Sequence, residues 1–314
     1  MNRREVVCED LSLAIDDLKR RGFRLDVIYP ADEPQAAVLS SAEETVRLLV
    51  PAAPPLPDAL PPFAPGFLLT RAGSGTGQGR AGMVYRDLIP GRLGGRYIAS
   101  HISITEPGPV ADWVHFHRIR FQMICVRKGW VRVVYEDQGE PFVMNAGDLV
   151  LQPPEIRHRV LENSAGLEVV EVGCPAVHET VADHDLELPN GVDRERRWSG
   201  QHFLHHIAAD TGWTPFGAGQ AQETAIGEAT AGLAEVRTIR RAGSPELAFP
   251  AHGGELVFGF VLDGSALFAR DGGLPLAAAD AFVIPPGEQW RLTQCSDDFR
   301  LLHVTTSVTT GDRG

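Results

Sequence analysis

The sequence contains only four cysteines in 314 residues. They lie far apart, and none belongs to a Cys-x-x-Cys pair, which excludes a zinc ribbon and a thioredoxin-like redox site. We expect all four thiols to be reduced and structural. They are Cys8, Cys125, Cys174 and Cys295.

Long apolar runs and an excess of basic residues are also missing. No stretch approaches the ~18 apolar residues of a membrane span, and the opening MNRREVVCEDL has no apolar segment after its basic residues. Lys and Arg number 29 against 41 Asp and Glu, so the net charge of −12 gives the chain no electrostatic attraction to nucleic acid or anionic membranes. We therefore expect a cytoplasmic protein with neither partner.

The remaining composition, 43% hydrophobic and 22% charged, is ordinary for a globular protein of about two domains. Residues 51–65 hold seven prolines, which predicts a stiff connector and a domain boundary. The glycine-rich run 73–82 contains Gly-x-Gly-x-x-Gly, but no strand precedes it and no helix follows it. It therefore predicts a loop lying over a barrel mouth and not a dinucleotide site.

The stretch 112–163 carries the densest chemical signal. Alternate residues of a strand share a face, so His115 and His117 in VHFH point the same way. Strand-like runs and turn residues then alternate as in an antiparallel meander. Pro153-Pro154 ends the last run, and the next strand starts near His158, which brings a third imidazole back to the first two.

This pattern resembles the two motifs of the cupin family. The usual fourth ligand of this family is Glu, whereas this chain has Gln122. A Gln ligand at this spacing is similar to that of small cupins that act on unsaturated sugar acids. A neutral set of donors is similar to that of cupin dioxygenases that hold iron by three histidines alone. The resemblance implies a metal site formed by His115, His117, Gln122 and His158. The matching motif residues are Gly129 in the first motif and Gly147-Asp148, Pro153-Pro154 and Asn163 in the second.

An internal repeat predicts a second barrel. His252 lies twelve residues before Gly264, as His117 lies before Gly129. In this alignment Pro250, Val257 and Trp290 replace His115, Gln122 and His158. We expect the second barrel to hold no metal, with Trp290 filling the space that a metal and its substrate need, although Glu255 could still contribute a ligand.

The first fifty residues predict a small β-α-β-β-β unit. A helix is expected from Asp10 to Arg21, between a strand at 3–8 and strands at 23–29, 35–39 and 45–50. The segment DLSLAIDDLKRRGFRLDVIYP resembles half of a glyoxalase-type (vicinal oxygen chelate) module. Because a second unit and a ligand set are missing, we expect this unit to have a structural or dimer-forming role, in a homodimer.

The predicted fold is mainly β, with two cupin (double-stranded β-helix, jelly-roll) barrels preceded by the small βαβββ unit. The boundaries follow from the composition shifts and the repeat. They are 1–50 for the glyoxalase-like half module, 51–92 for a Pro/Gly-rich linker, 93–175 for the metal-binding barrel, 176–200 for a second linker and 201–314 for the degenerate barrel.

Two further residues are candidates for catalysis. Arg120 lies two residues before Gln122, so in an unbroken strand it faces the barrel interior, where it can hold a substrate carboxylate. Tyr135 follows Val131 and Val133 on one strand face, and its hydroxyl is a candidate proton donor. His101 and Glu171 are weaker candidates, and we expect His178, Glu179 and His184 to be solvated or hydrogen-bonded.

Three imidazoles and an amide leave the charge of a divalent metal uncancelled, which favours a small anionic substrate. Iron(II) is favoured, and such a site also accepts Zn2+, Ni2+, Mn2+ or Cu2+. The favoured hypothesis is an enzyme, an iron(II) dioxygenase-type oxidoreductase. The alternatives are a redox-neutral isomerase or lyase on a sugar acid or keto acid, and a non-catalytic small-molecule-binding cupin.

Overall fold

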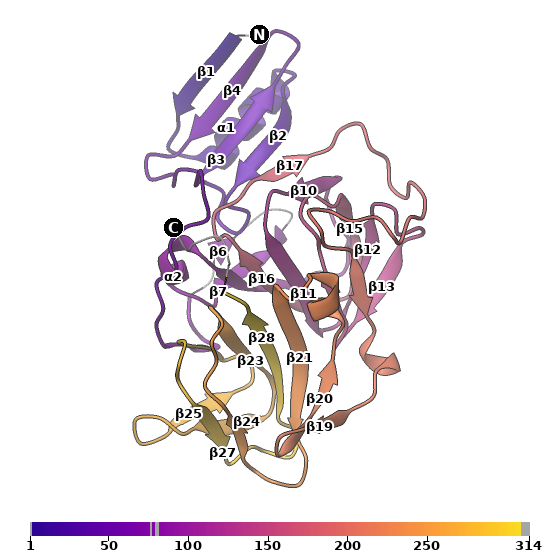
Figure 1. Cartoon of the computed structure of the whole chain (residues 1–314). Coiled ribbons are helices and arrows are strands. Elements are labelled where there is room, and N and C mark those ends of the chain that lie inside the picture. The colour runs from indigo at the N-terminus through magenta and orange to yellow at the C-terminus, as the bar shows by residue number, and fades with distance from the viewer. Residues whose placement is uncertain (1, 76, 79–81, 309–314) are drawn as a thin grey trace.

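The computed structural model describes residues 2–75, 77–78 and 82–308. It is mainly β, as predicted, and its three parts follow one another along the long axis of the molecule (Figure 1). The small N-terminal unit lies at one end, the first barrel in the middle and the second barrel at the other end. None of the helices in the described part is long and apolar enough to cross a membrane.

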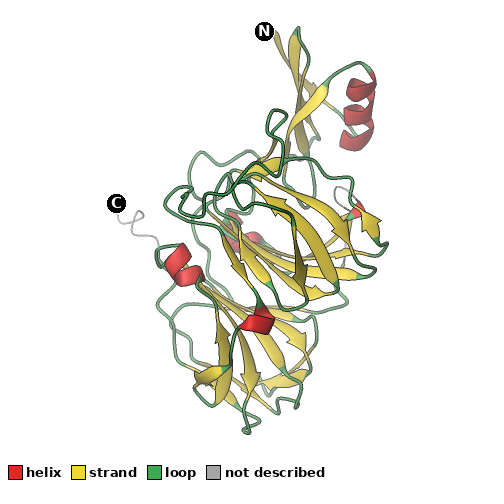
Figure 2. Ribbon diagram, turned by 90° about the vertical axis from the view of Figure 1, so that its right-hand side faces the viewer, coloured by secondary structure: helices red, strands yellow, loops and turns green. Residues whose placement is uncertain are grey.

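The N-terminal unit has the predicted βαβββ order. Its elements are β1 (Asn2–Val7), α1 (Leu11–Arg20), β2 (Arg24–Tyr29), β3 (Ala36–Ser40) and β4 (Glu44–Leu49). Asp10 caps the helix, because its carboxylate accepts a hydrogen bond from the Leu13 amide. The helix stands to one side of the strands (Figure 2) and buries Leu11 and Leu18. The resemblance of this unit to half of a glyoxalase module stays a prediction.

The sheet of the N-terminal unit continues into the first barrel. Its strand order is β1-β4-β3-β2, with β1 parallel to β4 and the other neighbours antiparallel. Strand β17 (Thr180–Ala182) then pairs with β2 on one side and with β10 (His115–His117) on the other. One ten-stranded sheet therefore links the N-terminal unit to the strand that carries two of the predicted metal ligands.

Two facing sheets form the first barrel. The ten-stranded sheet continues from β10 through β15 (His158–Asn163), β12 (Trp130–Tyr135) and β13 (Phe142–Asn145), with β9 (Gly108–Pro109) on β15. The second sheet has the order β18 (Leu204–His206), β14 (Leu149–Leu151), β11 (Phe121–Lys128), β16 (Leu167–Cys174), β8 (Ile98–Ile104), β7 (Val84–Asp87) and β6 (Gly77–Gln78). Gly129 makes the tight turn between β11 and β12 at φ 74°.

The second barrel repeats this arrangement. One sheet has the order β19 (Thr214–Phe216), β20 (Gly219–Glu223), β21 (Ala234–Arg241), β28 (Arg300–Thr306), β23 (Val257–Asp263), β26 (Ala281–Ile284) and β5 (Leu68–Thr70). The other contains β22 (Leu247–Phe249), β27 (Trp290–Thr293), β24 (Ser265–Phe268) and β25 (Leu274–Ala277). The short helices are α2 (Arg92–Gly95), η2 (Ala208–Asp210) and α3 (Ile226–Ala229).

The segments expected as linkers contribute strands to the barrels. Strand β5 comes from the 51–92 segment and completes a sheet of the second barrel through β26. Strand β17, from the 176–200 segment, joins the first barrel to the N-terminal unit, and β18, which follows it, pairs with β14 of the first barrel. Of the glycine-rich run expected as a loop over a barrel mouth, residues 76 and 79–81 lie outside the described residues, and residues 77–78 form β6.

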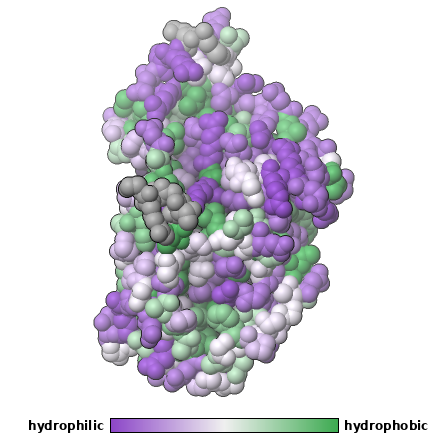
Figure 3. Space-filling view, in the orientation of Figure 1, coloured by the Kyte–Doolittle hydropathy of each residue, from purple (hydrophilic) through white to green (hydrophobic). Residues whose placement is uncertain are grey.

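One hydrophobic core spans both barrels, and a buried ion pair beside this core joins Arg96 to Glu255. Phe121 and Met123 of the first barrel share this core with Phe258 of the second. Next to it, the Arg96 guanidinium donates to both carboxylate oxygens of Glu255, at 2.9 and 2.6 Å. Glu255 is therefore a structural partner of Arg96. On the face drawn in Figure 3, hydrophilic side chains dominate the N-terminal unit and the first barrel, and apolar residues form small patches.

Candidate metal centre

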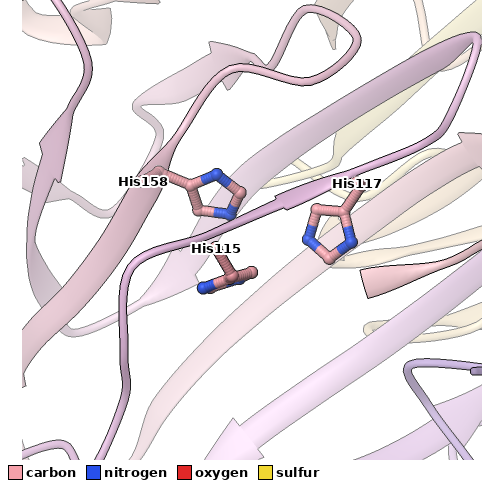
Figure 4. Close-up of side chains that lie close together, drawn as sticks. All are labelled: His115, His117 and His158. Carbon is pink, nitrogen blue, oxygen red and sulfur yellow. The ribbon is translucent and has the colours of Figure 1, made fainter. Parts of the chain in front are cut away.

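Three buried histidines converge inside the first barrel (Figure 4). His115 on β10 lies opposite His158 at the start of β15, and His117 follows on the same face of β10. One ring nitrogen from each of the three lies within 4.8 Å of the other two. Imidazole nitrogens at this separation can bind one metal ion together. Among the described residues this is the one group of His, Cys, Asp and Glu with such geometry.

Neighbouring groups fix the orientation of each imidazole. In His115 and His158, Nδ1 lies 2.7 and 3.0 Å from the backbone carbonyl oxygen of the residue two positions earlier. A carbonyl can only accept, so Nδ1 carries the hydrogen and Nε2 presents its lone pair. In His117, Nδ1 lies 3.0 Å from the Thr180 hydroxyl on β17. These bonds leave Nε2 of each ring as the ligand atom, as in typical histidine metal sites.

A chain of amide hydrogen bonds lies beside the histidines. Gln122 donates from Nε2 to Glu171 at 2.7 Å and accepts at Oε1 from the Gln152 amide at 3.1 Å. The Tyr135 hydroxyl donates to Gln152 Oε1 at 2.6 Å. The Gln152 amide nitrogen also lies 3.4 Å from Nε2 of His158. These bonds fix the direction of the Gln122 carbonyl, which borders the same cavity as the three histidines.

The histidines and this chain border a cavity of about 90 Å³. Its wall is mostly apolar. The lining residues are Ala31, Met83, Tyr85, Ile102, Ile104, His115, His117, Gln122, Ile124, Val131, Val133, Tyr135, Met144, Gln152, His158, Val160, Leu167, Val169 and Glu171. Ala31 follows β2 of the N-terminal unit, so this unit contributes to the cavity wall together with the two sheets of the first barrel.

The two predicted catalytic residues have different positions. Tyr135 is buried at the cavity wall and stacks on the His158 ring; burial raises the pKa of its phenol. Arg120 does not line this cavity. The strand that was expected to continue from Arg120 to Gln122 begins only at Phe121, after a bend, so alternation does not relate the two side chains.

Arg120 instead lines a separate open depression of about 680 Å³ between the barrels. Its guanidinium lies near Cys174, where burial raises the pKa of the thiol to about 12 against the opposing effect of Arg120. Its backbone carbonyl accepts from the Gln201 amide at 2.7 Å. The weaker candidate His101 pairs with Glu168, at 2.9 Å, and does not line the histidine cavity.

Two residues near the site had not been predicted for it. Gln152 follows an apolar run and precedes Pro153-Pro154, and a polar residue ending an inward-facing strand is a signal that could have identified it. His178 was expected to be solvated or hydrogen-bonded. It is only 3% exposed, its Nδ1 lies 3.1 Å from the Pro175 carbonyl oxygen, and its ring centroid lies 5.5 Å from that of His117. Burial lowers the pKa of His178. Its connection between β16 and β17 has no periodicity that could have predicted this.

The second barrel is filled with aromatic rings where the first barrel has its site. Phe249 lies opposite Trp290, as His115 lies opposite His158, so strand pairing shifts the predicted counterpart of His115 from Pro250 to Phe249. The Phe249 and Trp290 rings stack with centroids 3.7 Å apart.

His303 takes the position of Glu171 in the second barrel, because it lies opposite Gly259 on β23 as Glu171 lies opposite Ile124 on β11. Burial, together with Arg237 and His252, lowers the pKa of its imidazole to about 3. Among the described residues, no set of metal-ligating groups comes together in this barrel.

No family model and no curated protein matches the chain. Solved structures do match it. Oxalate decarboxylase from Bacillus subtilis at pH 4.6 is 11% identical, with 77% of this chain and 76% of that chain covered and a TM-score of 0.56. Protein Ylba from E. coli, of the family DUF861, is 11% identical, with 79% and 94% covered and a TM-score of 0.54.

At these identities the likeness shows the fold. The chain has the cupin fold, with jelly-roll barrels as predicted. Inside this fold, His115, His117 and His158 form a cluster that could hold a metal ion.

Proposed function

We propose that the first barrel binds one divalent metal ion through His115, His117 and His158, with the carbonyl oxygen of Gln122 as a fourth ligand, and that the protein is a metal-dependent enzyme acting on a small anionic organic molecule. The convergence of three buried imidazoles beside a cavity carries this proposal. Each imidazole has its Nδ1 held by a neighbour, so the ligand set is oriented before any ion binds.

The favoured reaction is an iron(II)-dependent dioxygenation. Iron(II) held by the three imidazoles alone would have three further coordination positions, which is the number that a bidentate substrate and O2 require. Gln122, the weakest of the four proposed ligands, would have to leave its position when both are bound. The donor set is neutral, because three imidazoles and an amide carry no charge to offset that of the ion. A carboxylate or enolate substrate should therefore bind this site more tightly than a neutral substrate does.

The surrounding residues would orient the ligands. Tyr135 keeps its proton, because burial raises the pKa of the phenol, and it already donates to Gln152. Gln152 in turn holds the Gln122 carbonyl. We assign Tyr135 the role of fixing this chain, which replaces the proton-donor role expected from the sequence. Arg120 lies outside the cavity, so substrate binding there would depend on the metal.

A second candidate is a redox-neutral reaction, such as that of an isomerase or lyase on a keto acid. Glu171 favours it, since it is the one carboxylate among the described residues of the cavity wall and lies beside Gln122. Oxalate decarboxylase, a structural neighbour, acts on a small dianion. A sugar acid is disfavoured because its hydroxyl groups would meet an apolar wall.

Two measurements test the proposal. Elemental analysis of protein purified without a metal-chelating tag should find a divalent metal that binds at the histidines. Turnover in a screen of small carboxylates and enols is then measured under strict anaerobiosis and in air. A dioxygenase stops without O2 and consumes it stoichiometrically when air returns. Full activity without O2 would replace the favoured reaction with the second candidate, and binding without turnover would leave a non-catalytic cupin.

A further inference from the structure

The polar and apolar residues of the histidine cavity are segregated along its strands. Inward-facing positions of a strand repeat every two residues, about 6.6 Å apart. On β12 these positions are Tyr135, Val133 and Val131, and on β15 they begin with His158 and Val160. On both strands the cavity-lining residue at the metal end is polar, and the cavity-lining residues beyond it are apolar.

The opposite sheet has the same order. On β11, Gln122 is followed inward by Ile124, and on β16, Glu171 is followed by Val169 and Leu167. Strand pairing offsets the two strands by one step, because Glu171 lies opposite Ile124 and Val169 lies opposite Val126. Glu171 still lies at the polar end, where its carboxylate accepts a hydrogen bond from Gln122. The cavity therefore has one polar end, at the histidines, and an apolar body that extends along four strands.

We propose that the substrate is an amphipathic chelator: a carboxylate with an adjacent keto, hydroxyl or enol oxygen at one end, and a short aliphatic or aromatic body without a second charge. This inference rests on the proposed function, and it specifies the substrate class of the same site. The metal-end groups take the chelating oxygens. The rest of the ligand lies against valine, isoleucine, leucine and methionine side chains. Burial of apolar ligand surface against these side chains is favourable.

A second charged group is disfavoured in the apolar part. No Lys or Arg belongs to the cavity wall formed by the described residues. A carboxylate placed there would lose its hydration without gaining a partner. A longer dicarboxylate is therefore a poor ligand, and the same reasoning applies to sugar acids with several hydroxyl groups.

An ordinary, closed barrel core is the competing explanation for these apolar residues. The two barrels distinguish the explanations. Ile124 and Val160 point into the first barrel and remain partly exposed. Their counterparts in the second barrel, Gly259 and Leu292, are buried. The interior of the first barrel is therefore hollow, with about 90 Å³ of room, where one water needs about 10–15 Å³.

Matched 2-oxo acids test the inference on the cobalt(II)-loaded full chain. Pyruvate, 2-oxopentanoate and 2-oxoglutarate share the chelating end, and the last two differ by a methyl group against a carboxylate at the far end. Binding is followed by calorimetry and by the visible cobalt spectrum. We expect affinity to rise about fourfold for each added methylene, and 2-oxopentanoate to bind at least about tenfold more tightly than 2-oxoglutarate.

Variants at one wall position sharpen the test. Val160→Lys adds a cation in the apolar part and should shift the preference towards 2-oxoglutarate. If this variant does not fold, Val160→Ala enlarges the same region and should favour 2-oxohexanoate over 2-oxopentanoate. Val143→Lys is the matched control, because Val143 is 41% exposed on β13 and does not line the cavity; it should leave all affinities unchanged.

The outcomes separate this inference from the proposed function. If all three acids change the cobalt spectrum but bind equally, or if 2-oxoglutarate binds best, the substrate class is overturned while the metal site stands. If the protein binds no metal, or no acid reaches the bound cobalt, both proposals fall together.

Discussion

The two barrels have the same strand arrangement, but the interior of the first contains a cavity and the interior of the second is filled with side chains. In the first, buried histidines and glutamines border a cavity. In the second, Phe249 and Trp290 stack in the equivalent positions, and Trp290 also packs edge-on against Phe282. Aromatic rings fill space and offer no lone pairs suited to a metal. A few residue differences therefore distinguish the first barrel, with its cavity and candidate metal site, from the packed interior of the second barrel.

The comparison also shows what each interior contributes to the molecule. A filled barrel stabilises its fold by burying apolar surface, whereas a hollow one gives up some of that burial to admit a ligand. The second barrel is joined to the first through the shared core and the Arg96–Glu255 pair. We infer that the packed barrel supports the hollow one.

The largest expected effect concerns the metal. His115→Ala combined with His117→Ala removes two of three imidazole ligands, so bound metal should fall to background in elemental analysis. His252→Ala changes the second-barrel histidine that the sequence repeat aligns with His117 and serves as the matched control, which should keep the metal content of the parent. Full metal occupancy in the double variant would refute the site.

The next effect concerns packing. Trp290→Ala opens a cavity in the filled barrel and should lower the free energy of unfolding by about 3–5 kcal/mol. His158→Ala, at the equivalent position, removes a ring that already borders a cavity, so its cost in metal-free protein should be much smaller. Urea unfolding of metal-free protein measures both. Equal losses would mean that the first barrel is as tightly packed as the second.

A smaller effect depends on pH. His303 has its pKa lowered to about 3 by burial, Arg237 and His252, from an ordinary value near 6.5. The unfolded chain takes up a proton below pH 6.5 and the folded chain does not. The stability from burying neutral His303 is therefore fully present above pH 6.5 and is lost as the pH falls towards 3.

Replacing His303 should flatten this pH profile. His303→Leu should lose less stability than the parent between pH 7 and pH 4, by about 3 kcal/mol. The measurement is urea unfolding at a series of pH values. His303→Phe, which keeps a ring against Phe249 and Trp290, provides an independent replacement. Parallel profiles for the parent and both variants would show that His303 does not titrate as described.

Sequence reasoning reached the fold and the three histidines because both depend on local patterns. Strand alternation aligned His115 with His117, and the turn residues brought His158 back to them. It failed where the chain departs from periodicity. The bend before β11 removes the strand alternation that was expected to relate Arg120 to Gln122. The irregular connection that carries His178 has no pattern from which its position beside His117 could be predicted.

Local patterns also could not predict which strands pair when they lie far apart in the sequence. Strand β5 completes the second barrel across about 200 residues, through its pairing with β26. Strand β17 draws the N-terminal unit onto the first barrel. These pairings are decided by which sheet edge is available in the folded molecule, which periodicity within a segment does not encode.

The smallest expected effect tests whether Gln122 belongs to the ligand set. Gln122→Val gives the first barrel the residue that the second has at Val257. Because an amide oxygen is a weaker donor than imidazole, metal affinity should fall by only about tenfold, measured by competition with a chromogenic chelator. Gln122→Glu should strengthen binding instead, because a carboxylate offsets the charge of the ion.

Val257→Gln is the matched control, and it should create no site, since Phe249 and Trp290 still fill that barrel. An unchanged affinity in both Gln122 variants would remove Gln122 from the ligands and leave a three-histidine centre. A loss as large as that of the histidine double variant would instead make the amide an essential ligand, and the neutral donor set would then depend on it as much as on the imidazoles.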